Sequence, residues 1–205
     1  MTLDKATVFI VDDDTSVRNA LKRLIQSIGY QVKNFDSAQA FLEHGPHDEP
    51  ACLILDVRMP GMSGIELQAQ LIHAGLEMPI IFITGHGSIP MSVKAMKAGA
   101  VDFIEKPFDD QKLIDAVNIA IKENEKFRIV QAQIKDIQCR VDSLTPREHE
   151  VFSLVVSGLL NKQIAYELGM SEKTVKVHRA RVMEKMGARS LAQLVRMAIA
   201  LKQEA

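Results

Sequence analysis

The chain has 205 residues, enough for one large domain or two small ones, and its 47% hydrophobic content is globular rather than disordered. No apolar run reaches the length of a transmembrane helix and no signal sequence opens the chain, so we expect a cytoplasmic protein without a membrane partner. The net charge is −1, but charge is unevenly distributed along the chain. There are 10 basic and 6 acidic residues from Thr145 onward, and 15 basic and 20 acidic residues before it. This asymmetry predicts two domains and a tail that binds a polyanion.

The first part of the chain alternates between apolar runs and amphipathic stretches. Short apolar runs predict strands, which we place at residues 7–11, 31–35, 51–56, 79–83 and 101–104. Helical spacing predicts helices, which we place at residues 15–28, 38–42, 64–74 and 88–98, with a long one from about residue 109. In the helix at 88–98, Val93 and Met96 are expected to face inward. The alternation predicts an α/β fold with a parallel sheet covered on both faces.

Polar residues stand where four of the predicted strands end. They are Asp12 and Asp13, Asp56, Thr84 and Lys106. Because ligands bind at the carboxyl edge of an open parallel sheet, we expect these side chains to share one site. Taken alone, Asp56 is equally compatible with a residue that caps a loop or the next helix, but the gathering at one edge favours the site.

The chemistry open to such a cluster is limited. Carboxylates at one edge repel each other unless a cation joins them, and Mg²⁺ prefers oxygen ligands. A carboxylate beside Mg²⁺ can attack a phosphoryl group to give an aspartyl phosphate, while Lys106 and Thr84 bind phosphoryl oxygens. The sequence has no GxxxxGK[ST] loop, so the phosphoryl donor is not expected to be a nucleotide bound here.

The combined motifs resemble the receiver domain of two-component response regulators over about residues 5–125. They comprise Asp12-Asp13, Asp56 followed by Met59-Pro60-Gly61, Thr84-Gly85 and Lys106-Pro107. The resemblance implies a doubly wound five-stranded sheet of order 2-1-3-4-5, with Asp56 as the phosphoacceptor. It also implies phosphoryl-binding or switch roles for Thr84, Lys106 and Phe103, although Phe103 is also compatible with an ordinary core residue on a strand.

The same resemblance implies a bound cation and a backbone feature. Mg²⁺ or Mn²⁺ would be held by Asp13, Asp56 and the backbone carbonyl of Arg58, with Asp12 acting through water. The Lys106–Pro107 bond would be cis. Arg58 and His86 lie two positions after Asp56 and Thr84, where family comparison suggests that side chains tune hydrolysis, although His86 is also compatible with a solvated loop residue.

A continuous helical pattern joins the two parts of the chain, because neither Gly nor Pro interrupts residues 108–141. Its first apolar stripe is Ile114, Val117 and Ile121. A second stripe, offset by one residue, has the 3-4-3-4 spacing of a coiled-coil seam and consists of Phe127, Val130, Ile134, Ile137 and Val141. We expect one long helix that is either a dimer seam or a rigid spacer. The predicted division is a receiver at 1–125, a helical linker at 126–142 and a DNA-binding domain at 143–205.

The tail is predicted to be all α-helical. Helices are expected at about residues 146–157, 161–168, 172–186 and 190–201, and the tight Gly-Met-Ser turn between the second and third predicts a helix-turn-helix. The third helix carries basic residues near its N-terminus, where a helix dipole favours anions, so a polyanion partner explains them better than a solvated cationic face.

The tail resembles the LuxR/NarL type of DNA-binding domain over residues 143–201. The resemblance is carried by Leu144-Thr145-Pro146-Arg147-Glu148, Gly158, Asn161-Lys162-Gln163-Ile164-Ala165 and Thr174-Val175-Lys176-Val177-His178. It implies base contacts from Lys176 and Val177, while Ala180 departs from relatives that carry a polar base reader there. Residues expected to contact phosphates are Lys173, Thr174, His178, Arg179 and Arg181.

Taken whole, the chain resembles a FixJ/NarL-type response regulator. The resemblance implies phosphorylation of Asp56 by a sensor histidine kinase, dimerisation on phosphorylation, promoter DNA as the target and RNA polymerase as a further partner. It implies no enzyme activity beyond the receiver's own phosphoryl transfer and hydrolysis. One rival is a phosphatase of the haloacid dehalogenase type, which requires Asp-x-Asp where this chain has Asp56, Val57 and Arg58. Another is a constitutive DNA-binding protein whose receiver is only a dimerisation scaffold.

Overall fold

The computed structural model describes residues 6–45, 47, 49–85 and 89–202. The chain divides into two compact units, Met1–Arg128 and Ile129–Ala205. His86 and the predicted helix start at Ser88 lie outside the described residues. In the part of the chain that is described, no helix is both long enough and apolar enough to cross a membrane.

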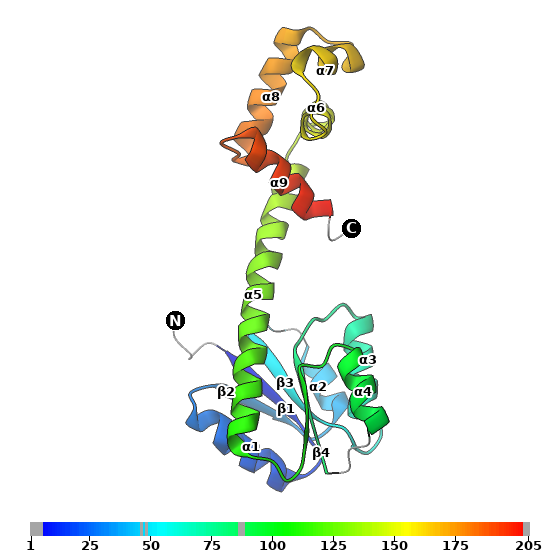
Figure 1. Cartoon of the computed structure of the whole chain (residues 1–205), viewed down its shortest axis with the longest axis vertical. Helices are drawn as coiled ribbons and strands as arrows, with labels where there is room; N and C mark the ends of the chain where they lie inside the picture. The colour runs from blue at the N-terminus through cyan, green and yellow to red at the C-terminus, as the bar shows by residue number, and fades with distance from the viewer. Residues whose placement is uncertain (1–5, 46, 48, 86–88, 203–205) are drawn as a thin grey trace. The chain divides into compact units, whose positions relative to one another are not determined.

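The first unit is built on a five-stranded parallel sheet (Figure 1). Its strands are β1 Thr7–Val11, β2 Gln31–Phe35, β3 Ala51–Asp56, β4 Ile80–Thr84 and β5 Asp102–Glu105. The strand order is β2-β1-β3-β4-β5, so the predicted order 2-1-3-4-5 is confirmed. Val11 of β1 is in register with Leu55 of β3, which places Asp12 and Asp56 next to each other at the carboxyl edge.

Helices cover both faces of this sheet (Figure 1). They are α1 Thr15–Ser27, α2 Ala38–His44, α3 Gly64–His73, α4 Ile89–Lys97 and α5 Asp110–Asp142. Apolar residues of α1 and α5 form one core with β1, β3 and β4. Residues of α2, α3 and α4 form the second core on the opposite face. The predicted double-sided α/β architecture is therefore confirmed.

The rotation of α4 differs from the prediction. Val93 and Met96 were expected inside, but they are 45% and 44% exposed, while Ala95 is fully buried against the sheet. The side-chain amide of Gln68, on α3, donates to the backbone carbonyls of Ala95 and Ala98 at 3.2 and 3.3 Å. The small alanine allows this close approach, so Val93 and Met96 are turned outward, whereas Met91 packs against the core.

Helix α5 is continuous from Asp110 to Asp142, as predicted. Asn124 lies where its first apolar stripe would continue, yet this side chain is buried. Its carbonyl oxygen accepts the backbone N–H of Ala51 at 3.0 Å, and its amide donates to the carbonyl of Glu77 at 3.3 Å. Asn124 therefore satisfies backbone groups at the amino end of the sheet, which an apolar residue could not do.

The proposed five-residue seam on α5 needs a correction. Val141 is only 8% exposed and Ile137 is partly buried, and both pack in the core of the second unit. Val130 is half exposed, and Ile134 is partly exposed. Heptad spacing selects one face of a helix but not its partner, and here the end of that face contacts the tail's own core. Phe127, Val130 and Ile134 lie outside that core, so they remain candidates for a seam.

The second unit is helical. It comprises the end of α5 with α6 Pro146–Val156, α7 Asn161–Leu168, α8 Glu172–Met186 and α9 Leu191–Lys202. A capping box begins α6, where the Thr145 hydroxyl accepts from the Glu148 N–H and the Glu148 carboxylate accepts from the Thr145 N–H. Gly169, with φ of 63°, ends α7, and Ser171 caps α8, so the predicted helix-turn-helix is confirmed.

Candidate functional site

A polar cleft of about 270 Å³ lies at the carboxyl edge of the sheet. It brings together every residue that the strand ends predicted there, and its lining includes Asp12, Asp13, Asp56, Arg58, Thr84 and Lys106. The cleft also includes Asp14 and Gly85, which the sequence did not single out as ligands. The parallel register explains the gathering, because neighbouring strands end at the same edge.

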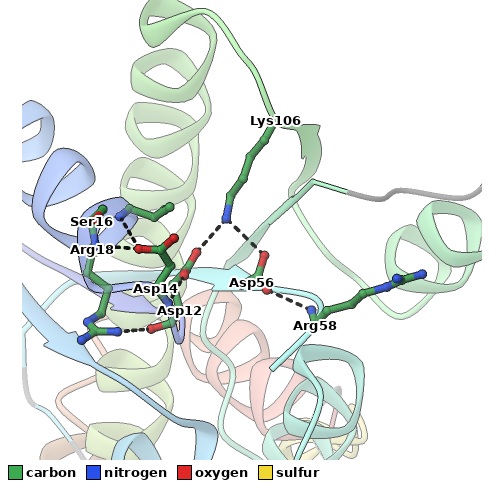
Figure 2. A network of polar contacts seen from close by, with 8 residues as sticks. Asp12, Asp14, Ser16, Arg18, Asp56, Arg58 and Lys106 are labelled. Atoms are coloured by element: carbon green, nitrogen blue, oxygen red, sulfur yellow. Dashed lines mark hydrogen bonds and ion pairs between the residues drawn. The ribbon is translucent and has the colours of Figure 1, made fainter. Parts of the chain in front are cut away.

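Lys106 bridges the two buried carboxylates of the cleft (Figure 2). Its Nζ lies 2.8 Å from Asp12 Oδ2 and 3.3 Å from Asp56 Oδ1. Burial raises the pKa of Asp56, the Lys106 charge opposes that rise and the Asp12 charge adds to it. Burial alone would lower the pKa of Lys106, but its hydrogen bonds and charge interactions with Asp12 and Asp56 together outweigh burial and leave that pKa raised. The lysine is thus a fixed positive charge between two anions.

Hydrogen bonds hold the acidic loop that follows β1 (Figure 2). The Asp14 N–H donates to Asp12 Oδ1 at 2.8 Å, and the Asp14 carboxylate caps α1 by accepting the Ser16 N–H at 2.7 Å. This backbone hydrogen bond lowers the pKa of Asp14. Arg18 Nη1 donates to the Asp12 carbonyl at 2.6 Å. Arg18, one turn into α1, was missed from sequence because nothing in its spacing marks it.

The backbone after Asp56 is fixed from both sides. Asp56 Oδ2 accepts the Arg58 N–H at 3.0 Å. The N–H of Gly64, at the start of α3, donates to the Val57 carbonyl at 3.0 Å. A Cβ at Gly64 would overlap the carbonyl oxygen of Asp56, so only glycine allows α3 to begin this close to the strand end.

Thr84 and Phe103 stand beside the cleft. Thr84 is buried at the end of β4, and its carbonyl accepts the N–H of Lys106 at 2.8 Å. The Lys106–Pro107 bond is cis, as the receiver resemblance implied. Phe103 on β5 is half-buried, with its ring centroid 6.1 Å from that of Phe82. The ring is therefore only partly packed in the core. Its role as a switch residue stays a prediction.

The donor set of the cleft suits a hard cation. No three His, Cys, Asp or Glu side chains converge as a closed metal cage within the described residues. Mg²⁺ keeps several bound waters and needs few protein ligands, so two carboxylates and one backbone carbonyl are enough to bind it. Burial of Asp56 beside Asp12, with a single lysine between them, leaves negative charge that such a cation would neutralise.

The candidate nucleic-acid surface lies on α8. Most of its predicted contact residues are exposed, namely Lys173, Thr174, Lys176, Val177 and Arg181. The apolar side chain of Val177 is 47% exposed, although its neighbours on this face of α8 are cationic. Lys176 Nζ lies 3.6 Å from Glu172 Oε1, but both side chains are exposed, so the pair holds Lys176 only weakly.

Two of the predicted phosphate contacts are less exposed than the others. His178 and Arg179 are half-buried. Arg179 Nη1 donates to Asn161 Oδ1 at 2.9 Å, which links α8 to the first residue of α7. His178 Nδ1 is buried without a hydrogen-bond partner among the residues that the structure describes. Arg179 therefore supports the helix-turn-helix geometry as well as being a candidate for phosphate binding.

The last turn of α8 carries a polar contact that the sequence did not indicate. Lys185 Nζ lies 2.7 Å from the buried Glu148 carboxylate and 3.0 Å from the Ser143 carbonyl. The hydrogen bond from Lys185, followed by that from the Thr145 N–H, lowers the pKa of Glu148 to about 2. These two residues lie 37 positions apart, so no local spacing could have paired them.

The fold and the two sites together define a signalling regulator of transcription, with an α/β receiver followed by a helix-turn-helix. Comparison with known proteins agrees: the model for the response regulator receiver domain matches residues 8–118, and that for bacterial regulatory proteins of the luxR family matches residues 142–198. The chain belongs to the two-component response regulators that carry a LuxR-type DNA-binding domain. Membership in this family argues against the haloacid dehalogenase alternative.

Similar proteins match along almost the whole chain. Nodulation protein W of Bradyrhizobium diazoefficiens is 51% identical over 94% of this chain and 85% of its own length. Transcriptional regulatory protein FixJ of Rhizobium meliloti is 49% identical over 95% of each chain. Among solved structures, the response regulator StyR is 51% identical, with a TM-score of 0.85 over 95% of this chain and 98% of that one.

Proposed function

We propose that a sensor histidine kinase phosphorylates Asp56 and that this modification promotes dimerisation and sequence-specific binding to promoter DNA. The observation that carries the proposal is the buried Asp56 carboxylate, held 3.3 Å from Lys106 Nζ at the carboxyl edge of the sheet. We further propose that the protein acts in the cytoplasm, where it meets its kinase and DNA, and that it works with RNA polymerase.

Each residue of the cleft has a separate role in the proposed phosphoryl transfer. An Asp56 oxygen attacks the phosphorus of a phosphohistidine, the O–P bond forms, the P–N bond breaks and the leaving imidazole takes a proton. Lys106 turns from Asp56 to a phosphoryl oxygen while it keeps Asp12, and the Thr84 hydroxyl donates to another. Asp12, Asp13, Asp56 and the Arg58 carbonyl would hold Mg²⁺ or Mn²⁺, which would neutralise charge on the phosphoryl group.

Phosphorylation is tested by mass. Acetyl phosphate with Mg²⁺ should add one base-labile phosphoryl group to the wild-type protein and none to Asp56→Asn. Asp13→Asn should label slowly, because it weakens the cation site but keeps the nucleophile. Equal labelling of Asp56→Asn would place the phosphoacceptor elsewhere. Labelling without any change in DNA affinity would instead favour the constitutive DNA-binding protein with a scaffold receiver.

The outward face of α4 supports dimerisation. Ile89 is 81% exposed, and Val93 and Met96 are exposed beside it. On this basis we propose that two activated receivers pair through α4 and β5, next to Phe103, with Val130 and Ile134 of α5 as candidates for a seam. Sedimentation with the phosphoryl mimic beryllofluoride should show dimers that Val93→Asp with Met96→Asp abolishes.

The matched control lies on another helix. Ile72, on α3, is also exposed. Ile72→Asp should therefore leave the dimer intact. If this control variant also fails to dimerise, any added charge on the receiver blocks association. A dimer that persists in the α4 variant would assign the interface to another surface.

A further inference from the structure

The last turns of α5 belong to the core of the second unit. Val141 is buried and Ile137 is partly buried in the same apolar cluster as Val182 and Met186 of α8. The expected linker helix thus ends inside the DNA-binding unit rather than in front of it. Its final residues contact the helix that carries the predicted base readers.

Arg140 joins the two helices through a polar contact. Its Nη1 donates to the carbonyl of Met186, the last residue of α8, at 2.9 Å. Its Nη2 lies 2.8 Å from Asp136 Oδ2, one turn back on α5, which orients the guanidinium. The last carbonyls of a helix lack intrahelical partners and carry partial negative charge, so a cation there is favourable.

The residue after α8 leaves room for this contact. Gly187 ends the helix with φ of 64°, and a Cβ there would lie 2.5 Å from Arg140 Nη1. The guanidinium therefore lies directly against the helix end. Lys185, one residue before Met186, contacts the Ser143 carbonyl and Glu148 on the other side of the α5–α6 junction. Arg140 thus joins the last turn of α8 to the end of α5, while Lys185 joins it to the α5–α6 turn and to α6.

We propose that Arg140 is a positioning residue that fixes the angle between α5 and the recognition helix α8. The inference rests on the proposed DNA binding by Lys176 and Val177. With this joint in place, the direction of the linker helix sets the direction in which these two side chains point. A dimer whose linker helices are paired would then present two recognition helices at one defined separation and rotation, which selects one half-site spacing.

The rigidity of the joint is measured directly by electron spin resonance. Cys139 is exposed on α5 while Cys52 is buried, so a thiol spin label reacts at Cys139 alone. A second label at Glu172→Cys, on the first turn of α8, reports the distance between the two helices. The intact full chain should give a narrow distance distribution, and Arg140→Ala should broaden it. Arg147→Ala is the matched control, because Arg147 pairs with Glu150 on its own helix.

The consequence for DNA is measured with two half-sites. Wild-type protein loaded with beryllofluoride should prefer one half-site spacing over a spacing changed by half a helical turn, about 5 bp. Arg140→Ala should lose this preference while its affinity for a single half-site stays within about threefold of wild type, because the base-reading face is untouched. Arg147→Ala should behave as wild type in both measurements.

The outcomes separate the inference from the function on which it rests. If the wild-type protein shows no spacing preference, the proposed paired recognition is wrong. If wild type shows it and Arg140→Ala keeps both the preference and the narrow distribution, Arg140 is not a positioning residue. Should Arg140→Ala unfold the tail, Arg140→Lys decides, because lysine cannot bridge Met186 and Asp136 with two nitrogens. An unchanged distance distribution and spacing preference in Arg140→Lys would overturn the inference.

Discussion

Removing the positive charge at Lys106 should destabilise the receiver in the absence of divalent cations. Lys106→Met keeps much of the side-chain stem but leaves Asp12 and Asp56 side by side, and their side chains are only 1% and 9% exposed. Losing one partner of a fully buried ion pair costs about 3–5 kcal/mol. Lys106 is 24% exposed, which admits solvent and reduces the expected loss to about 1–3 kcal/mol.

The pH dependence of this variant has a defined sign. Burial already raises the pKa of Asp56, and removal of the Lys106 charge, which opposes that rise, should raise it further. A carboxyl group whose folded-state pKa lies above its unfolded value destabilises the fold when it is ionised. The deficit of Lys106→Met should therefore be present at neutral pH and diminish as the pH falls through the raised pKa of Asp56.

Denaturant titration of the receiver transition, with and without Mg²⁺, measures both effects. Mg²⁺ should stabilise Lys106→Met more than wild type. In the variant the cation replaces the missing positive charge beside Asp12 and Asp56, which Lys106 already supplies in the wild-type protein. Lys112→Met, at an exposed position on α5, removes the same charge and should change little. If Lys106→Met is as stable as Lys112→Met in chelator at pH 7, the two carboxylates are not held together by the lysine.

Further predictions concern the tail and the amino end of the sheet. Because the pKa of Glu148 is lowered to about 2, its stabilisation of the tail should be complete above the usual glutamate range and decline as the pH falls from 4.5 towards 2. Circular dichroism of Glu148→Gln should show a weaker acid dependence. Lys176→Ala should cost about 1–3 kcal/mol at the specific DNA site, whereas Arg181→Ala should weaken all sequences alike and flatten the salt dependence, in titrations at several salt concentrations. Asn124→Leu should lower the free energy of unfolding by about 1–3 kcal/mol in urea, because it leaves the Ala51 N–H buried without an acceptor.

The receiver site could be predicted because its geometry follows from topology. Parallel strands end at one edge, so a polar residue after each apolar run is enough to place Asp12, Asp56 and Thr84 together. No comparable rule places Arg18, whose contact with the site is to the backbone carbonyl of Asp12. Such contacts leave no mark in residue type or spacing.

Helix rotation and the partners of apolar stripes were harder to predict. Periodicity indicates that α4 has an apolar face, but the Gln68 amide and the small Ala95 decide which residues turn inward. The stripe on α5 has coiled-coil spacing, yet Val141 meets the core of the tail. In both cases the decisive contact is with a residue distant in sequence, which a single chain read locally does not reveal.

The burial of Ile137 and Val141 has a consequence for building chimaeric regulators. A transplant that begins at residue 143, where the family resemblance begins, would strip two apolar side chains from the tail and expose the surface that they cover. A graft that begins near residue 129, where the second compact unit begins, carries this helical segment along with Arg140. The DNA-binding unit that can be exchanged between regulators is therefore larger than its helix-turn-helix. Its boundary lies within a helix rather than in a loop.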